Sequence, residues 1–272
     1  MARPASCTLK AIVLDWAGTM IDHGSRAPVE AFREIFRRRR VPITVDEARG
    51  PMGMEKRAHI AALAAMPRIA DAWQQVHRSE VSAADIDEMY QDFLPVQREL
   101  LPQHADLIPA VLQSLTDMRQ RGLRIGSSSG YAAPLMAQLV PVARARGLHL
   151  DAVVSASDVP AGRPAPWMIF KNMELLDCYP PASIVTVDDT TVGVEAGRNA
   201  GTWSVGVVET GNVLGLTHME LEQLPAAERE SRRNAGRRLM REAGAHYAID
   251  SVADLPQVLD EVTQRLARGE CP

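Results

Sequence analysis

Six short apolar runs, separated by segments with helical character, constrain the fold of this chain more than any other feature. The runs occupy residues 10–15, 123–127, 152–155, 183–188, 203–208 and 246–249. Such runs are typical of strands buried on both faces, and the helices between them favour right-handed crossovers. The sequence therefore predicts an α/β protein with a doubly wound parallel sheet.

Residues 27–100 interrupt this alternation because they contain helical patterns only. The expected helices are 27–40, 44–49, 54–65, 68–79 and 82–100. Pro28 suits the first turn of its helix, and Ser82 suits an N-cap. We therefore expect a helical cap domain over residues 24–100, inserted into a core made of residues 1–23 and 101–272.

Composition narrows the class of protein. The net charge is −4 with both signs mixed, which argues against a general nucleic-acid binder. The three cysteines, Cys7, Cys178 and Cys271, are far apart and form no metal or disulfide pattern. No apolar run approaches the roughly 20 residues of a membrane span, and the N-terminus lacks a leader's apolar region. The expected location is the cytoplasm, with no membrane or nucleic-acid partner.

The first strand ends in an acid. Residues 11–14 lead into Asp15, and a small-residue turn follows, so the carboxylate reaches the edge where open α/β sheets bind ligands. Asp15 could act as a nucleophile or merely cap the next turn. Position 17, where a second acid could assist a leaving group, holds Ala17.

Three further segments place polar groups after apolar runs. Residues 126–130 end in Ser129 and Gly130, and their hydroxyl and backbone N–H groups could bind a phosphate or form an ordinary loop. Arg163 precedes two prolines that open a helix, and it could hold an anion or lie exposed. Asp188 and Asp189 end another run, and such adjacent carboxylates suit Mg²⁺, although a capped turn also explains them.

The order of these segments resembles the haloacid dehalogenase superfamily of phosphotransferases. The resemblance implies a Rossmann-like core in which Asp15 attacks phosphorus, while Ser129 and Arg163 bind the phosphoryl group. It also implies Mg²⁺ held by Asp15, Asp189 and the main-chain carbonyl of Ala17, with Asp188 just outside the ligand set. Phosphatases of the superfamily usually carry an acid at position 17, so Ala17 argues against ordinary phosphate-ester hydrolysis.

The cap contains a candidate nucleophile of its own. Residues 50–53 contain two glycines and a proline, which predict a turn before a helix. Lys56 falls in the first turn of that helix, where the positive helix end and burial would lower the pKa of its amine. Such a lysine can form a Schiff base, although most lysines lie on surfaces. His59 shares its helical face.

The match then narrows to the phosphonoacetaldehyde hydrolase (phosphonatase) family. The motifs Asp-Trp-Ala-Gly-Thr at 15–19, Pro-Met-Gly-x-x-Lys at 51–56 and Gly-Arg-Pro-Ala-Pro-Trp at 162–167 carry it, and similarity extends from about residue 8 to the final helix. The resemblance implies Mg²⁺-dependent cleavage of a small phosphonate through a Lys56 Schiff base and an Asp15 aspartyl-phosphate. It also implies substrate contacts from Ser25, Met52 and Gly53, with His59 and Tyr131 moving protons or orienting Lys56.

Three positions depart from the family pattern: Ser25 replaces a cysteine, Ser129 a threonine, and Gly193 an acid that some relatives carry. The resemblance further implies a homodimer through the cap. Ile60, Leu63, Met66, Ile69 and Trp73 could form that surface or the cap's own core. The alternatives are a phosphatase or phosphomutase acting on a small phosphate ester, and a non-catalytic phosphate-binding relative.

Overall fold

The computed structural model describes residues 8–272. Cys7 and the start of the chain, which we expected not to be a leader, lie outside the described residues. Six strands form one fully parallel sheet in the order β3-β2-β1-β4-β5-β6. They are β1 (Ala11–Leu14), β2 (Arg124–Ser129), β3 (Ala152–Ser155), β4 (Ile184–Asp188), β5 (Trp203–Val207) and β6 (Tyr247–Ile249). All six predicted strands are confirmed, and so is the α/β class.

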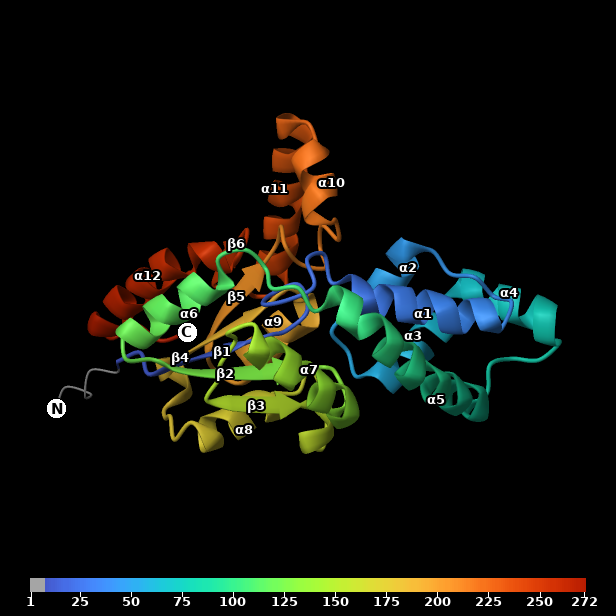
Figure 1. The fold of residues 1–272 in the computed structure, drawn as a ribbon, viewed down its shortest axis with the longest axis horizontal. Helices are drawn as coiled ribbons and strands as arrows, with labels where there is room; N and C mark the ends of the chain where they lie inside the picture. The colour runs from blue at the N-terminus through green and yellow to red at the C-terminus, as the bar shows by residue number, and fades with distance from the viewer. Residues whose placement is uncertain (1–7) are drawn as a thin grey trace.

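Helices cover both faces of the sheet (Figure 1). Alternate residues of β1 point to opposite sides, so Ile12 and Leu14 join one apolar cluster and Ala11 and Val13 join another. One face is covered by α6 (Val111–Gln120), α7 (Ala133–Ala145) and α12 (Leu255–Ala267). The other is covered by α8 (Trp167–Leu175), α9 (Thr191–Asn199) and α11 (Ala226–Glu242).

Several shorter elements join these layers. Helix α10 (His218–Gln223) precedes α11, and the two project away from the core in Figure 1. Four 3-10 turns complete this part of the chain: η1 (Leu101–His104), η2 (Ala156–Asp158), η3 (Pro181–Ser183) and η4 (Val252–Asp254). Within residues 8–272, no helix combines the length and the apolar character needed to cross a membrane.

The five predicted cap helices are present between β1 and β2. They are α1 (Arg26–Arg38), α2 (Val45–Arg49), α3 (Lys56–Ala64), α4 (Pro67–His77) and α5 (Ala83–Leu100). Ser82 caps α5 as expected, since its hydroxyl accepts a hydrogen bond from the backbone N–H of Asp85 at 3.2 Å. The helices pack around their own apolar cluster, which is separate from the clusters of the sheet. The division at residues 24 and 100 stays a prediction, and we use the name cap for residues 24–100.

The apolar residues that we considered for a dimer surface are part of the cap's own core. Ile60, Leu63, Ile69 and Trp73 are at most 1% exposed, and Met66 packs against the same cluster. Of the two roles open to these side chains, core packing is the one that the structure shows.

The sheet order reverses beside β1. The chain moves from β1 through β2 to β3 on one side, and β4 then pairs with β1 on the other. Open α/β sheets bind ligands at the carboxyl edge of such a switch point. Asp15 follows β1, and Asp188 and Asp189 lie at the end of β4, so the predicted acids meet at this edge.

Candidate active site

The register of the sheet brings three side chains into one row. Leu14 of β1 pairs with Ser127 of β2 and with Val187 of β4, and the backbone N–H of Asp15 donates to Val187 O at 2.9 Å. The next residues along the three strands are Asp15, Ser128 and Asp188. This alignment selects Ser128 as the serine that lies beside the first acid.

Arg163 binds all three members of this row. Its Nη2 donates to Asp15 Oδ1 at 2.6 Å and to Ser128 Oγ at 2.9 Å, and it lies 2.9 Å from Asp188 Oδ2. The side chain of Arg163 is only 4% exposed. Burial alone would lower its pKa, but the carboxylates of Asp188 and Asp15 raise the pKa above its usual value. Arg163 is therefore a permanent cation at the bottom of the site.

Three buried acids surround that cation. One carboxylate oxygen from each of Asp15, Asp188 and Asp189 lies within 4.8 Å of the others. Burial raises the pKa of Asp15 to about 7 against the lowering effect of Arg163, and burial, together with Asp15, raises the pKa of Asp189 well above its usual range. One arginine cannot balance three carboxylates, so a divalent cation with oxygen ligands fits this cluster.

Backbone groups hold the two adjacent acids in place. Asp188 Oδ1 accepts hydrogen bonds from the backbone N–H of Thr190 at 2.9 Å and from its hydroxyl at 2.7 Å. Asp189 Oδ2 accepts one from the backbone N–H of Asn212 at 2.7 Å. A Cβ on Gly193 would lie 1.9 Å from Asp188 Cγ, so an acid at position 193 has no room while Asp188 keeps this position.

Lys56 enters the site from the cap. It is the first residue of α3, whose N-terminus is capped by the Glu55 carboxylate through the backbone N–H groups of Arg57 and Ala58, each at 3.0 Å. The lysine is 4% exposed, and burial lowers the pKa of its amine to about 8. Roughly a tenth of such an amine is neutral at pH 7, so Lys56 can act as a nucleophile under ordinary conditions.

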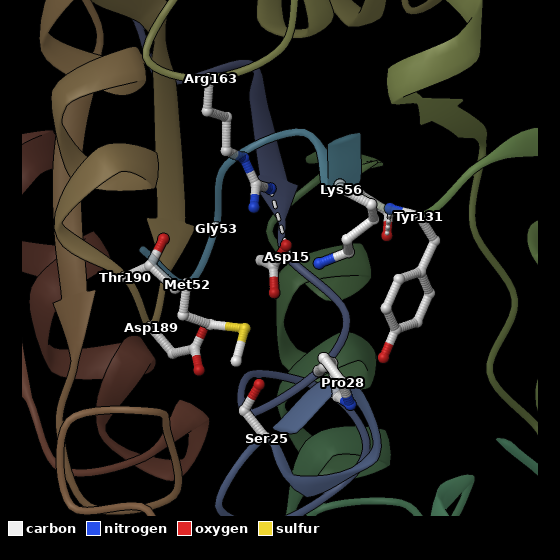
Figure 2. Close-up of a pocket in the computed structure, with 13 residues that line it drawn as sticks. Asp15, Ser25, Pro28, Met52, Gly53, Lys56, Tyr131, Arg163, Asp189 and Thr190 are labelled. Atoms are coloured by element: carbon white, nitrogen blue, oxygen red, sulfur yellow. Dashed lines mark hydrogen bonds and ion pairs between the residues drawn. The ribbon is translucent and has the colours of Figure 1, made fainter. Parts of the chain in front are cut away.

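A single pocket joins the cap and core residues (Figure 2). Ten sequence-predicted site residues line it: Asp15, Ala17, Ser25, Met52, Gly53, Lys56, Ser129, Tyr131, Arg163 and Asp189. Gly130, from the segment that the sequence offered to a phosphate, also lines it, and so do Pro28 and Thr190, which were missed as site residues. Figure 2 shows the Lys56 amine directed toward Asp15 between the core strand and Tyr131. Asp188 and His59 are not among the lining residues.

His59 lies beneath the pocket wall. It is fully buried and stacks on Phe32 with ring centroids 3.7 Å apart, and the amine of Lys56 lies 5.7 Å from the centroid of that same ring. Its Nε2 lies 3.0 Å from Ala48 O. A carbonyl oxygen can only accept, so Nε2 carries the hydrogen of the neutral ring and donates a hydrogen bond to Ala48 O. Burial and Lys56 lower the pKa of His59 well below its usual value. A neutral His59 supports Phe32 rather than touching the pocket.

Two hydroxyl-bearing residues that the sequence singled out, Ser129 and Tyr131, line the pocket and make further contacts with its surroundings. Ser129 Oγ accepts a hydrogen bond from the backbone N–H of Tyr131 at 3.1 Å, whereas Ser128 contacts Arg163. Tyr131 forms a wall of the pocket with its ring centroid 5.5 Å from the Lys56 amine, and burial raises the pKa of its hydroxyl. The strand register was the signal that could have identified Ser128.

Comparisons with known proteins agree with this geometry. A family model described as a haloacid dehalogenase-like hydrolase matches residues 9–201. The chain is 45% identical over 264 residues to the phosphonoacetaldehyde hydrolase of Paraburkholderia phytofirmans, which covers 97% of this chain and 99% of the relative. The chain belongs to the phosphonoacetaldehyde hydrolase family. The family's member from Pseudomonas aeruginosa is 42% identical over 265 residues, 97% of this chain and 96% of that one.

A solved structure supports the family and its fold. The phosphonoacetaldehyde hydrolase-like protein from Oleispira antarctica superimposes with a TM-score of 0.97 and is 39% identical, covering 100% of this chain and 99% of its own. Membership of this family means that the chain is a hydrolase. It also confirms the haloacid dehalogenase-like fold that we predicted from the order of the strands and motifs.

Proposed function

We propose that this chain hydrolyses the carbon–phosphorus bond of phosphonoacetaldehyde to acetaldehyde and phosphate, as a step in 2-aminoethylphosphonate degradation. One observation carries the proposal: a buried amine from the cap, Lys56, and a buried carboxylate from the core, Asp15, line the same pocket. The absence of an acidic side chain at Ala17 fits a reaction in which no alkoxide leaves.

Lys56 activates the aldehyde. Its neutral amine adds to the aldehyde carbon, and loss of one water gives an imine that becomes a cationic iminium on protonation. The iminium withdraws electrons from the carbon that is bonded to phosphorus. Tyr131 and Phe32 flank the amine and hold it out of water, which keeps its pKa near 8. Met52, Gly53 and Ser25 line the remaining space and position the aldehyde.

Asp15 then attacks phosphorus. Its carboxylate oxygen forms a bond to phosphorus, the carbon–phosphorus bond breaks, and that electron pair enters the iminium to leave an enamine on Lys56. Arg163 holds Asp15 through Nη2 and provides positive charge beside the phosphoryl oxygens, while Ser129 fixes the start of the turn that bears Tyr131.

Water completes the cycle in two places. One water hydrolyses the aspartyl-phosphate to phosphate and restores Asp15. The enamine is protonated on carbon, and a second water releases acetaldehyde from Lys56. One water is consumed overall, because imine formation released one. Tyr131 is the proposed proton carrier at the amine, and His59 orients Lys56 through Phe32.

The acid cluster fits Mg²⁺. Asp15, Asp189 and the main-chain carbonyl of Ala17 are its proposed ligands, and Asp188 lies beside them as an acceptor for Arg163 and Thr190. When bound, Mg²⁺ supplies positive charge to the phosphoryl oxygens and offsets the repulsion between the carboxylates.

The decisive experiment tests both halves of the pocket. Purified enzyme with Mg²⁺ is expected to release acetaldehyde and phosphate in equal amounts from phosphonoacetaldehyde. Borohydride added during turnover is expected to leave a two-carbon adduct on Lys56, located by mass spectrometry. An adduct on another lysine, or cleavage of a panel of phosphate monoesters in preference to phosphonoacetaldehyde, would redirect the assignment to the phosphatase or phosphomutase class.

Assembly and location belong to the same proposal. The family resemblance supports a homodimer formed through the cap, using surfaces other than its buried apolar core. The unpatterned cysteines support a reducing cytoplasm. Light scattering coupled to size-exclusion chromatography is expected to give twice the 29.7 kDa mass of the chain.

A further inference from the structure

Arg49 reaches from the cap to the core. It is the last residue of α2, and its Nη1 donates to Gly24 O at 2.8 Å and to Asn212 Oδ1 at 3.0 Å, while Nη2 donates to Gly215 O at 2.8 Å. The Asn212 amide donates back to Arg49 O at 3.4 Å. Within residues 8–272, no carboxylate forms an ion pair with this guanidinium. Its hydrogen bonds go to Gly24 O inside the cap and to Asn212 Oδ1 and Gly215 O of the core.

Arg49 and the first residue of the cap lie close against the core. A Cβ on Gly215 would lie 2.4 Å from Arg49 Cζ, and a Cβ on Gly24 would lie 2.4 Å from Leu216 O. The backbone N–H of Gly24 donates to Thr210 O at 2.8 Å. The guanidinium therefore lies between Gly24 and residues 208–217, which we name the seat loop.

The same seat loop holds a member of the acid cluster. The backbone N–H of Asn212 donates to Asp189 Oδ2 at 2.7 Å, and a Cβ on Gly211 would lie 2.4 Å from Asp189 Cβ. Asn212 thus accepts from the cap through its side chain and donates to Asp189 through its backbone. One residue connects cap position to the orientation of a carboxylate.

We propose that Arg49 is a positioning residue that couples cap closure to cation binding at Asp189. With the cap closed, Arg49 fixes the seat loop so that the backbone N–H of Asn212 orients Asp189; with the cap open, that restraint is lost. Because coupling between two sites is reciprocal, bound cation favours the closed cap by the same factor. The inference rests on the proposed function only in taking Asp189 as a cation ligand.

Calorimetric titration of the full-length protein with Mg²⁺, without substrate, tests this coupling. Arg49→Met is expected to weaken Mg²⁺ binding about 10–100-fold, the usual effect of losing a group that orients a metal ligand. Arg33→Met is the matched control, because Arg33 lines the same surface pocket as Arg49 but is exposed. It is expected to bind Mg²⁺ within about twofold of the wild type, since its loss leaves the orienting contacts in place.

Asn212→Ala and the double variant distinguish a specific path from Arg49 through Asn212 to Asp189 from a general loss of stability. Asn212→Ala removes one of the three acceptors of Arg49, the one on the residue that orients Asp189, but keeps the backbone donor to Asp189. If the two residues act in one path, Arg49→Met/Asn212→Ala weakens Mg²⁺ binding no more than the stronger single variant, whereas independent destabilisation adds. Amide exchange in residues 210–215 is expected to quicken in both single variants before any metal is added.

The outcomes are distinct. Equal Mg²⁺ affinity in wild type and Arg49→Met, or additive losses in the double variant, overturns the coupling and leaves the proposed function intact. Failure of the wild type to bind Mg²⁺ overturns the proposed cation site itself. If Arg49→Met does not fold, Asn212→Ala alone decides, because a wild-type affinity in that variant contradicts a path through Asn212.

Discussion

Lys56 is a buried amine flanked by two aromatic rings. An arginine at this position keeps a positive charge but cannot form an imine, because its guanidinium stays protonated. Lys56→Arg is therefore expected to reduce acetaldehyde release by about a thousand-fold or more, as losses of covalent catalysts do. The neighbouring exposed Arg57→Lys serves as control and is expected to retain activity. Substantial turnover by Lys56→Arg would remove the imine from the mechanism.

The pH dependence follows from the same residue. Burial lowers the pKa of Lys56 to about 8, and only the neutral amine attacks an aldehyde. With saturating Mg²⁺, which keeps the Asp15 carboxylate ionised, kcat/KM is expected to rise with a slope that approaches tenfold per pH unit below pH 8 and to level off above it, because the neutral fraction of the amine follows that course. A profile that is flat between pH 6 and 9, measured by phosphate release, would contradict this assignment.

At the scale of elements, the loop before α3 is a part of the cap that packs closely against the core. Gly53 has φ +92°, and a Cβ there would lie 2.4 Å from the Thr190 hydroxyl; a Cβ on Gly162 would lie 3.2 Å from Glu55 Cβ. We named Gly53 as a substrate contact from its motif. Its close approach to Thr190 gives it a second requirement, which is to let the cap close.

Gly53→Ala is therefore expected to lower kcat/KM about a hundred-fold, because small displacements of a reacting group have effects of this size. Gly50→Ala is the matched control in the same loop, since Gly50 has φ −50° and its nearest neighbour to a Cβ is 3.5 Å away. In Gly53→Ala, the amount of Lys56 trapped by borohydride should decrease in parallel with the turnover rate. Equal rates for the two variants would show that the loop tolerates the added methyl group.

The turn between β4 and α9 excludes an acid at position 193. Gly193→Asp is expected to destabilise the protein by about 1–3 kcal/mol, since a Cβ at 1.9 Å from Asp188 Cγ forces that side chain or the helix to move. Urea unfolding measures the change. A variant as stable as the wild type would mean that Asp188 has another position available at little cost.

Strand ends were predictable because an apolar run followed by a polar residue is a local pattern, as at Asp15 and Asp189. Register was harder to predict, because the pairing of two strands is absent from the pattern of either strand alone; the contact of Ser128 with Arg163 was therefore missed. Arg49 looked like an ordinary arginine at a helix end, and its partners, Asn212 and Gly215, are distant in sequence. The apolar residues of α3 and α4 suited a core and an interface equally, and only packing separated the two.

At the scale of the whole molecule, the acid cluster makes the metal-free fold less stable than it could be. The raised pKa of Asp189 means that the folded chain binds more protons than the unfolded chain, so stability falls as pH rises from the usual carboxylate pKa up to the raised pKa of Asp189. Asp189→Asn is expected to raise the metal-free unfolding temperature. Mg²⁺ at 100 times its dissociation constant should stabilise the wild type by about 2.7 kcal/mol and should not stabilise the variant. Thermal unfolding with Mg²⁺ and with a chelator checks both.

The two groups that bond to substrate stand on different bodies, Asp15 on the sheet and Lys56 on the inserted helices. In the proposed reaction, the phosphoryl group is left attached to one body and the two-carbon fragment to the other. Any movement of the cap then carries the two products apart while both are still covalently bound. Recombination would require the two fragments to be realigned, so the division of the reacting groups between two bodies would slow the reverse of the cleavage step.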